Sequence, residues 1–331
     1  MIFSTLFFYL HSIITTFTKN QGLTPNTSNT KFKNGSVITI GTFDGVHIGH
    51  QKIIERLVKT AKEKNLKAVV LTFFPHPRMV LQPDFKIQLL HTIDERKDVL
   101  SKFGLDKLVI KEFTKEFANL SAHEYVKNVL IDELNVKHII IGYDHHFGKN
   151  RTANINDLIS YGAIFDFTVE EIVAQDIKDV AVSSTKIRQA LVEGDIKTAN
   201  SYLGYPYFLT GNVIKGKGIG KTLKFPTANI NIEKEYKLIP KNGVYVVKSI
   251  IDDETVFGMM NIGTNPTFNE DKQSIEVHFF ETDKNLYDTT LKIDILHRLR
   301  DETKFEDIKQ LVSQLNLDKE NSQTFIKKYD K

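Results

Sequence analysis

The stretch Val37–Val58, VITIGTFDGVHIGHQKIIERLV, joins an apolar run to an amphipathic one through a glycine-rich turn. Its first five residues, VITIG, are typical of a buried strand. After the turn, apolar residues recur at the spacing of one helical face: Ile53, Ile54, Leu57, Val58 and Ala61. Strand, turn and helix in this order predict an α/β domain with a parallel sheet covered by helices.

The same alternation continues along the first part of the chain. Further strand-like runs are AVVLTF (68–73), KLVI (107–110) and KHIIIG (137–142). Two capping boxes, Thr92 with Glu95 and Ser121 with Glu124, mark helix starts between them. In an open sheet of this class we expect ligands at the carboxyl ends of the strands.

After Gly204 the pattern changes to strands without intervening helices. The runs are YFLTGNVI, GVYVVKSII, TVFGMMNIG, SIEVHFF and LKIDILHRL, and an amphipathic helix, FEDIKQLVSQLN, closes the chain. Such a sequence predicts an antiparallel barrel with a C-terminal helix. We therefore divide the chain into an N-terminal extension or edge element (1–36), an α/β domain (37–203) and a barrel domain (204–331).

Composition narrows the class of protein. The 331 residues are 41% hydrophobic and 26% charged, with a net charge of +3, so we expect no nucleic-acid partner. The chain has no cysteine, which excludes disulfides, thiolate metal sites and a cysteine nucleophile, and a cytoplasmic location is expected. The apolar start, MIFSTLFFYLHSIITTF, lacks the basic residues of an export signal and is short for a membrane span, so we expect no stable membrane association.

Polar residues gather where the expected strands end, in TFDGVHIGH, FPHPR, GYDHHFGKNR and SSTKIR. In the first of these, Gly41 lets a ligand approach the backbone, and Asp44 and Gly45 turn the chain. His47 and His50 then bracket the first turn of a helix. Two imidazoles at a helix N-terminus, where free amides and the dipole favour anions, predict a phosphate site.

Metal ligation by histidine is an alternative use of this region. The candidates are His47, His50, His76, His145 and His146. Their spacing matches no familiar zinc set, and zinc sites usually recruit cysteine or carboxylate. We expect instead Mg²⁺ that arrives with a nucleotide.

A second glycine-rich stretch, GNVIKGKGIGKTLKFPTAN (211–229), ends like a P-loop in Gly220, Lys221 and Thr222. The P-loop pattern requires an earlier glycine where this chain has Lys215. Pro226 would also interrupt the helix that must follow a P-loop. The stretch is therefore not a P-loop.

Two of these motifs resemble signatures of a known superfamily. GTFDGVHIGHQ and SSTKIR are similar to the two signatures of the HxGH nucleotidyltransferases. The resemblance implies that His47 and His50 stabilise the α-phosphate of an NTP under direct attack. It also implies that Arg188, with Ser184 and Thr185, holds the β- and γ-phosphates.

TFFPHPR and GYDHHFGKNR narrow the resemblance to the FMN adenylyltransferase half of the bacterial bifunctional riboflavin kinase/FAD synthetases. The residues that the resemblance places against ATP or flavin are Gly41, Phe43, Asp44, Gly45, His76 and Asp144. Phe73, Phe74 and Phe147 could stack on a flat ring, but aromatic residues at strand ends are more often core. Phe74 also stands where many relatives carry an acidic residue.

The second half resembles the riboflavin kinase module, a Greek-key barrel. The resemblance implies that Gly216, Gly218 and Gly220, with Lys221, form a flap over ATP. It implies that Thr227 and Asn229 meet Mg²⁺ and phosphate. Glu276, in an alternating strand, would be the base that receives the hydroxyl proton.

The resemblance as a whole implies a two-site enzyme. ATP would phosphorylate riboflavin to FMN in the barrel and adenylylate FMN to FAD in the α/β domain. Three positions depart from the family pattern, since Lys221 replaces arginine and Lys224 and Asp288 replace glycine. Two alternatives stay open: an adenylyltransferase with a non-catalytic barrel, and a flavin-binding regulator without turnover. A homo-oligomer is also left open.

Overall fold

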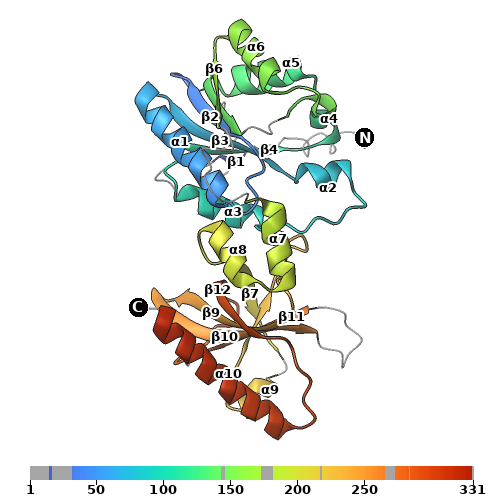
Figure 1. Ribbon diagram of the computed structural model, residues 1–331, viewed down its shortest axis with the longest axis vertical. Helices are drawn as coiled ribbons and strands as arrows, with labels where there is room; N and C mark the ends of the chain where they lie inside the picture. The colour runs from blue at the N-terminus through green and yellow to red at the C-terminus, as the bar shows by residue number, and fades with distance from the viewer. Residues whose placement is uncertain are drawn as a thin grey trace, which may run out of the picture. The chain divides into compact units, whose positions relative to one another are not determined.

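The computed structural model describes residues 15–16, 32–142, 146–172, 182–216, 218–264, 273–282 and 284–329. They fall into two compact units, Met1–Ala181 and Val182–Lys331 (Figure 1). Within the described residues, no helix combines the length and the apolar character needed to cross a membrane.

The first unit is built on a six-stranded sheet in the order β1-β4-β3-β2-β5-β6. Five strands are parallel, and the two-residue β1 pairs antiparallel with β4 at one edge. The strands are β1 (Thr15–Thr16), β2 (Ser36–Ile40), β3 (Lys67–Phe74), β4 (Lys107–Glu112), β5 (Val136–Gly142) and β6 (Thr168–Ile172). Because β2 comes first in the parallel set and lies between β3 and β5, the strand order reverses there, which is where such sheets bind ligands.

Helices cover the sheet of the first unit. They are α1 (Ile48–Lys64), α2 (Pro77–Leu81), α3 (Ile93–Ser101), α4 (Lys115–Ala118), α5 (Ala122–Glu124), the π-helix η1 (Tyr125–Glu133), the 3₁₀ turn η2 (Lys149–Arg151) and α6 (Ile155–Phe165). Helix α1 packs on β2, β3 and β5 through Ile54, Leu57 and Ala61 of the expected apolar stripe. Both predicted capping boxes are present, at the starts of α3 and α5.

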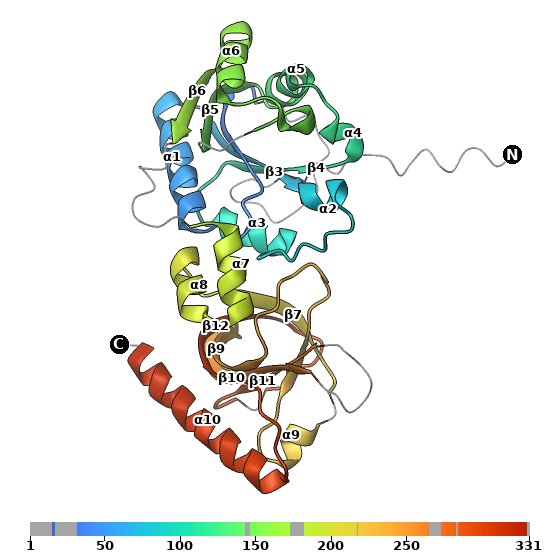
Figure 2. The ribbon, with the colours of Figure 1, turned by 45° about the vertical axis from the view of Figure 1, so that its right-hand side comes forward.

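The second unit contains a closed antiparallel barrel in the order β10-β11-β8-β7-β12-β9 (Figure 2). Its strands are β7 (Phe208–Ile214), β8 (Ala228–Asn231), β9 (Gly243–Ile251), β10 (Glu254–Thr264), β11 (Gln273–Phe279) and β12 (Thr290–Arg300). Strands β9 to β11 form a meander and β12 returns beside β9, which is a Greek key. The short α9 (Ile219–Thr222) follows β7, and α10 (Ile308–Tyr329) packs on β9, β10 and β12. The fold prediction is confirmed.

Two helices that precede the barrel, α7 (Ser184–Glu193) and α8 (Ile196–Leu203), belong to the second unit. The amide of Asn200 donates to the carbonyl of Ile295 at 2.9 Å, and its oxygen accepts from the backbone N–H of Tyr207 at 2.7 Å. The backbone N–H of Lys241 donates to the carbonyl of Leu191 at 3.0 Å. The boundary between the two compact units therefore lies between Ala181 and Val182. The expected boundary between the domains of the two activities, between residues 203 and 204, stays a prediction.

Candidate active sites

The loop that follows β2 has an unusual backbone. Phe43 and Val46 have φ values of 49° and 35°, in the left-handed region, and Gly45 between them has a φ of 84°. A β-branched residue rarely adopts such a φ value. Strained residues of this kind persist only where neighbouring segments hold them in place, and they are frequent at functional sites. In this protein, contacts with a neighbouring segment hold the loop in place.

Asp44 ties the loop to the segment before α3. Its carboxylate accepts the backbone N–H groups of Leu90 at 3.0 Å and His91 at 3.1 Å, and it lies 3.7 Å from a guanidinium nitrogen of Arg96. Asp44 and Arg96 are both almost fully buried. A buried carboxylate that is engaged in this way fixes the position of the loop from which His47 projects.

His47 and His50 stack on each other at the start of α1. Their ring centroids are 3.6 Å apart and their planes differ by 16°. His47 caps the helix, and its Nδ1 accepts the backbone N–H of His50 at 3.4 Å. Burial lowers the pKa of His47 to about 4, and burial together with the nearby His47 and Arg96 lowers the pKa of His50 well below its usual range. Both rings are therefore neutral at pH 7 and can offer N–H donors to an anion.

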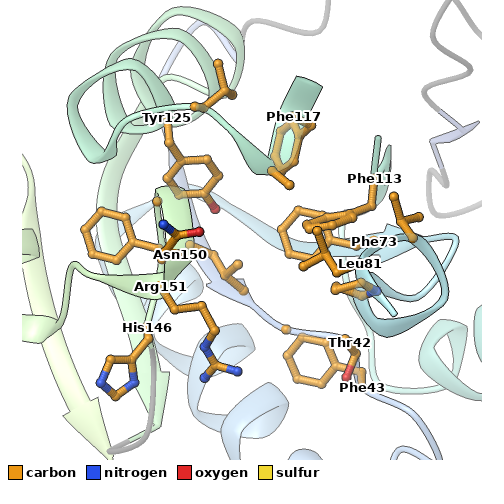
Figure 3. Close-up of a pocket in the computed structure, with 18 of the residues that line it drawn as sticks. Thr42, Phe43, Phe73, Leu81, Phe113, Phe117, Tyr125, His146, Asn150 and Arg151 are labelled. Atoms are coloured by element: carbon orange, nitrogen blue, oxygen red, sulfur yellow. The ribbon is translucent and has the colours of Figure 1, made fainter. Parts of the chain in front are cut away.

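A cavity of about 670 Å³ opens at the carboxyl ends of the strands (Figure 3). One part of its wall is apolar and includes Phe73, Leu81, Phe113 and Phe117. The polar part includes Gly41, Thr42, His50, His146, Asn150 and Arg151. No carboxylate occurs among the described lining residues. The cavity therefore offers an apolar surface to a flat ring and nitrogen groups to an anion.

Tyr125, the first residue of the π-helix η1, directs its hydroxyl into this cavity (Figure 3). The hydroxyl oxygen is buried and has no hydrogen-bond partner among the described residues. Burial raises the pKa of this phenol, so it stays protonated. Sequence reasoning missed Tyr125, Phe113 and Phe117 because each lies within or beside a helix and shows only an apolar pattern. It also missed Arg151, although its segment, GYDHHFGKNR, is expected at a strand end.

The predicted ligand contacts of the first unit separate into groups. Gly41, Phe43 and His50 line the cavity, whereas Asp44 and Gly45 shape the loop behind it. His76 caps α2, and its Nδ1 accepts the backbone N–H of Arg78 at 3.2 Å. Asp144, and His145 of the alternative metal set, lie outside the described residues.

The aromatic residues considered for stacking fall in different places. Phe73 lines the cavity and contacts the rings of Phe113 and Phe117, with centroids 5.8 and 5.6 Å apart. Phe147 also lines the cavity, yet it is buried and packs beside Tyr125. Phe74 precedes Pro75 through a cis peptide bond and does not line the cavity. Phe73 and Phe147 therefore belong both to the hydrophobic core and to the wall of the cavity.

Ser184, Thr185 and Arg188 share the first two turns of α7. The hydroxyl of Ser183 caps this helix by accepting the backbone N–H of Lys186 at 3.3 Å. Thr185 is exposed, and Ser184 and Arg188 are half-buried. The structure therefore brings these three predicted phosphate contacts onto one helix N-terminus of the second unit.

A second cluster lies at the barrel, where β8 meets β11. The hydroxyl of Thr227 donates to the Glu276 carboxylate at 3.3 Å, and Asn229 lies directly opposite Glu276 in the β-ladder. A Cβ at Gly216 would come within 2.1 Å of the Asn229 amide, and one at Gly220 within 2.3 Å of the Phe225 carbonyl. The glycine segment therefore lies against Phe225 and Asn229, and a side chain at position 220 would collide with a backbone carbonyl.

The other residues of the expected flap are less confined. Gly218 has a φ of 72°, and a Cβ added to it would meet no described atom within 4 Å. Lys221 is exposed in α9. Lys224 and Asp288 each have a φ of 63°. These are the two positions at which the resemblance implies glycine, and a left-handed backbone is one that glycine adopts without steric cost.

Two family models match consecutive stretches of the chain: FAD synthetase over residues 29–186 and riboflavin kinase over residues 203–326. A protein of Listeria monocytogenes named bifunctional riboflavin kinase/FMN adenylyltransferase is 38% identical over 89% of this chain and 93% of its own length. The chain belongs to this bifunctional family. A relative of the same name from Bacillus subtilis is 38% identical over 87% of this chain and 91% of its own length.

A solved structure has the same fold. The crystal structure titled as a macrolide-efflux protein from Streptococcus pneumoniae has a TM-score of 0.81 and 33% sequence identity to this chain. The match covers 89% of this chain and 96% of that one. The likeness therefore spans both units.

Proposed function

We propose that the chain carries out two consecutive reactions of flavin cofactor synthesis. Riboflavin and ATP give FMN and ADP at the barrel, and FMN and a second ATP give FAD and pyrophosphate at the α/β site. The observation that carries this proposal is that each matched stretch holds its own cluster of reactive groups, the stacked His47 and His50 in one and the bonded Thr227 and Glu276 in the other.

In the kinase reaction, Glu276 accepts the proton of the 5′-hydroxyl of riboflavin. The hydroxyl oxygen then attacks the γ-phosphorus of ATP, the bond from that phosphorus to the bridging oxygen breaks, and ADP leaves. The hydrogen bond from Thr227 holds the carboxylate in place for this transfer. Gly216, Gly218 and Gly220, with Lys221, cover the ATP phosphates.

Mg²⁺ is part of this proposal, and the residues at the barrel site fit it. Thr227 and Asn229 bring a hydroxyl and an amide oxygen, which are hard donors of the kind that Mg²⁺ prefers, next to the Glu276 carboxylate. The described residues contain no cluster of three or more histidine and carboxylate side chains that could hold a metal alone, so the nucleotide phosphates would supply the other ligands. When bound, Mg²⁺ neutralises charge on the phosphates.

In the adenylyl transfer, an oxygen of the FMN phosphate attacks the α-phosphorus of ATP. The bond from that phosphorus to the β-bridging oxygen breaks, and pyrophosphate leaves without a covalent enzyme intermediate. His47 and His50 donate N–H groups to the charge that develops on the α-phosphate. Arg188, Ser184 and Thr185 hold the β- and γ-phosphates.

The cavity suits the two substrates of this second reaction. The wall of Phe73, Leu81, Phe113 and Phe117 would take the isoalloxazine ring, since such rings pack well on aromatic and aliphatic surfaces. Gly41 leaves room at the cavity wall for the nucleotide. The remaining proposed contacts with ATP or flavin are Phe43, Asp44, Gly45, His76 and Asp144.

Product analysis tests the proposal. The purified full chain is incubated with riboflavin, ATP and Mg²⁺, and the flavins are separated by chromatography while pyrophosphate is measured. We expect FMN to appear first, then FAD with an equal amount of pyrophosphate. FAD that forms only from added FMN would contradict the kinase assignment and support a non-catalytic barrel. Flavin binding without either product would support a regulator.

A cytoplasmic location stays a prediction, which cell fractionation can test.

A further inference from the structure

The loop after β5 holds its tip in a fixed conformation. The backbones of Phe147 and Ala153 exchange two hydrogen bonds, of 3.0 and 3.2 Å, and both side chains are buried. Between them, Arg151 donates its backbone N–H to the carbonyl of Gly148 at 3.0 Å. Asn150 and Arg151 at the tip have φ values of 54° and 55°. Two successive left-handed residues in a closed loop fix the direction in which the Cα–Cβ bond of the exposed Arg151 leaves the backbone.

That direction is into the cavity. Figure 3 shows the Arg151 side chain extending from the loop toward the side of the cavity that Thr42 and Phe43 line. The described cavity lining contains no acidic residue that could pair with its guanidinium. A guanidinium in this setting is available to a ligand anion.

The position of Arg151 relative to the other lining groups indicates which anion it meets. His50 lines the same cavity at the start of α1, where the attacked α-phosphate of ATP is proposed to lie. The other described cation of the lining, Lys115, belongs to α4, whose Phe117 is part of the apolar wall. Arg151 therefore lies at the polar part of the cavity, opposite the surface proposed for the flavin ring.

We propose that Arg151 binds the 5′-phosphate of FMN and thereby selects FMN over riboflavin as the acceptor of the adenylyl group. The inference rests on the proposed adenylyltransferase function. Two anions must approach each other in this reaction, and a guanidinium reduces their repulsion while its planar fork orients the phosphate. Riboflavin, which has no phosphate, gains nothing from this contact.

The test uses the full chain with Glu276→Gln, so that riboflavin is not consumed by the kinase site. Arg151→Gln and Arg151→Lys are compared with Lys149→Gln, an exposed cation of the same loop that does not line the cavity. The KM values for FMN and ATP are measured, together with the inhibition constant of riboflavin against FMN. Lys115→Gln removes one positive charge elsewhere in the cavity lining and serves as a charge control.

We expect Arg151→Gln to raise the KM for FMN roughly ten- to hundredfold, the effect of losing a charge-assisted hydrogen bond. The KM for ATP and the inhibition constant of riboflavin should stay within twofold, Arg151→Lys should restore part of the FMN affinity, and Lys149→Gln should behave like the parent. An unchanged KM for FMN in Arg151→Gln would overturn the inference, as would an equal rise in Lys115→Gln or an equal loss of riboflavin affinity. Failure of the parent to form FAD would instead refute the proposed function.

Discussion

The imidazole rings of His47 and His50 lie face to face, 3.6 Å between centroids, with Nδ1 of His47 accepting the backbone N–H of His50. Burial keeps both rings neutral at pH 7. Two neutral rings stack without the repulsion that two imidazolium ions would have. The pair is therefore preorganised as hydrogen-bond donors, and an arriving phosphate can raise the pKa of either ring.

Replacing either ring should separate the two activities. We expect His47→Gln and His50→Gln each to lower the rate of FAD formation from FMN by a factor of roughly 100 or more, because a donor to the developing charge is lost. Riboflavin phosphorylation should be unchanged, since its proposed residues lie in the other unit. His123→Gln, at an exposed histidine of α5, is the matched control. Loss of both activities in the His47 and His50 variants would contradict independent sites.

The lowered pKa of His47 predicts a pH-dependent stability. The unfolded chain binds a proton at this histidine below about pH 6.5, but the folded chain does so only near pH 4. Stability is therefore lost as the pH falls from 6.5 to 4, by about 3 kcal/mol in full. Urea unfolding at pH 7.5 and at pH 5 should show about 2 kcal/mol of this loss, and His47→Gln should reduce it. An identical loss in that variant would show that other groups are responsible.

Glu276 should matter to the kinase reaction alone. In Glu276→Gln the side chain keeps its size but no longer accepts a proton, so we expect riboflavin phosphorylation to fall by a factor of roughly 100 or more. FAD formation from added FMN should continue at the rate of the parent chain. The conservative variant Glu276→Asp should retain measurable kinase activity. Full kinase activity in Glu276→Gln would show that another group receives the proton.

Lys224 occupies a backbone conformation that favours glycine, with a φ of 63°. Glycine adopts this conformation without steric cost but loses more entropy on folding, so Lys224→Gly should change the free energy of unfolding by less than about 1 kcal/mol. A β-branched residue is much less tolerant, and Lys224→Val should lower the free energy of unfolding by about 1–2 kcal/mol. Denaturant unfolding of both variants measures the difference. Equal stability of the two would contradict the assigned backbone.

The sequence alone predicted the two architectures of the chain. The spacing at which apolar residues recur predicted which segments form strands and which form helices. This spacing can be read within a short stretch of sequence, because it records which face of one element is buried. The capping boxes at Thr92 and Ser121 were also readable, since each acts within a few residues. The proposed roles of Thr227 and Glu276 came separately from a family resemblance, and only the barrel register brings the two side chains together.

Only the tertiary structure decided how distant segments share one site. The sequence placed Asp44 in a turn, but only the structure shows that its carboxylate accepts backbone N–H groups of Leu90 and His91, far along the chain. Tyr125 and Arg151 line one cavity although one begins a helix and the other ends a loop motif. Such contacts depend on which strand ends are neighbours and on the course of the loops, and no local period in the sequence encodes either.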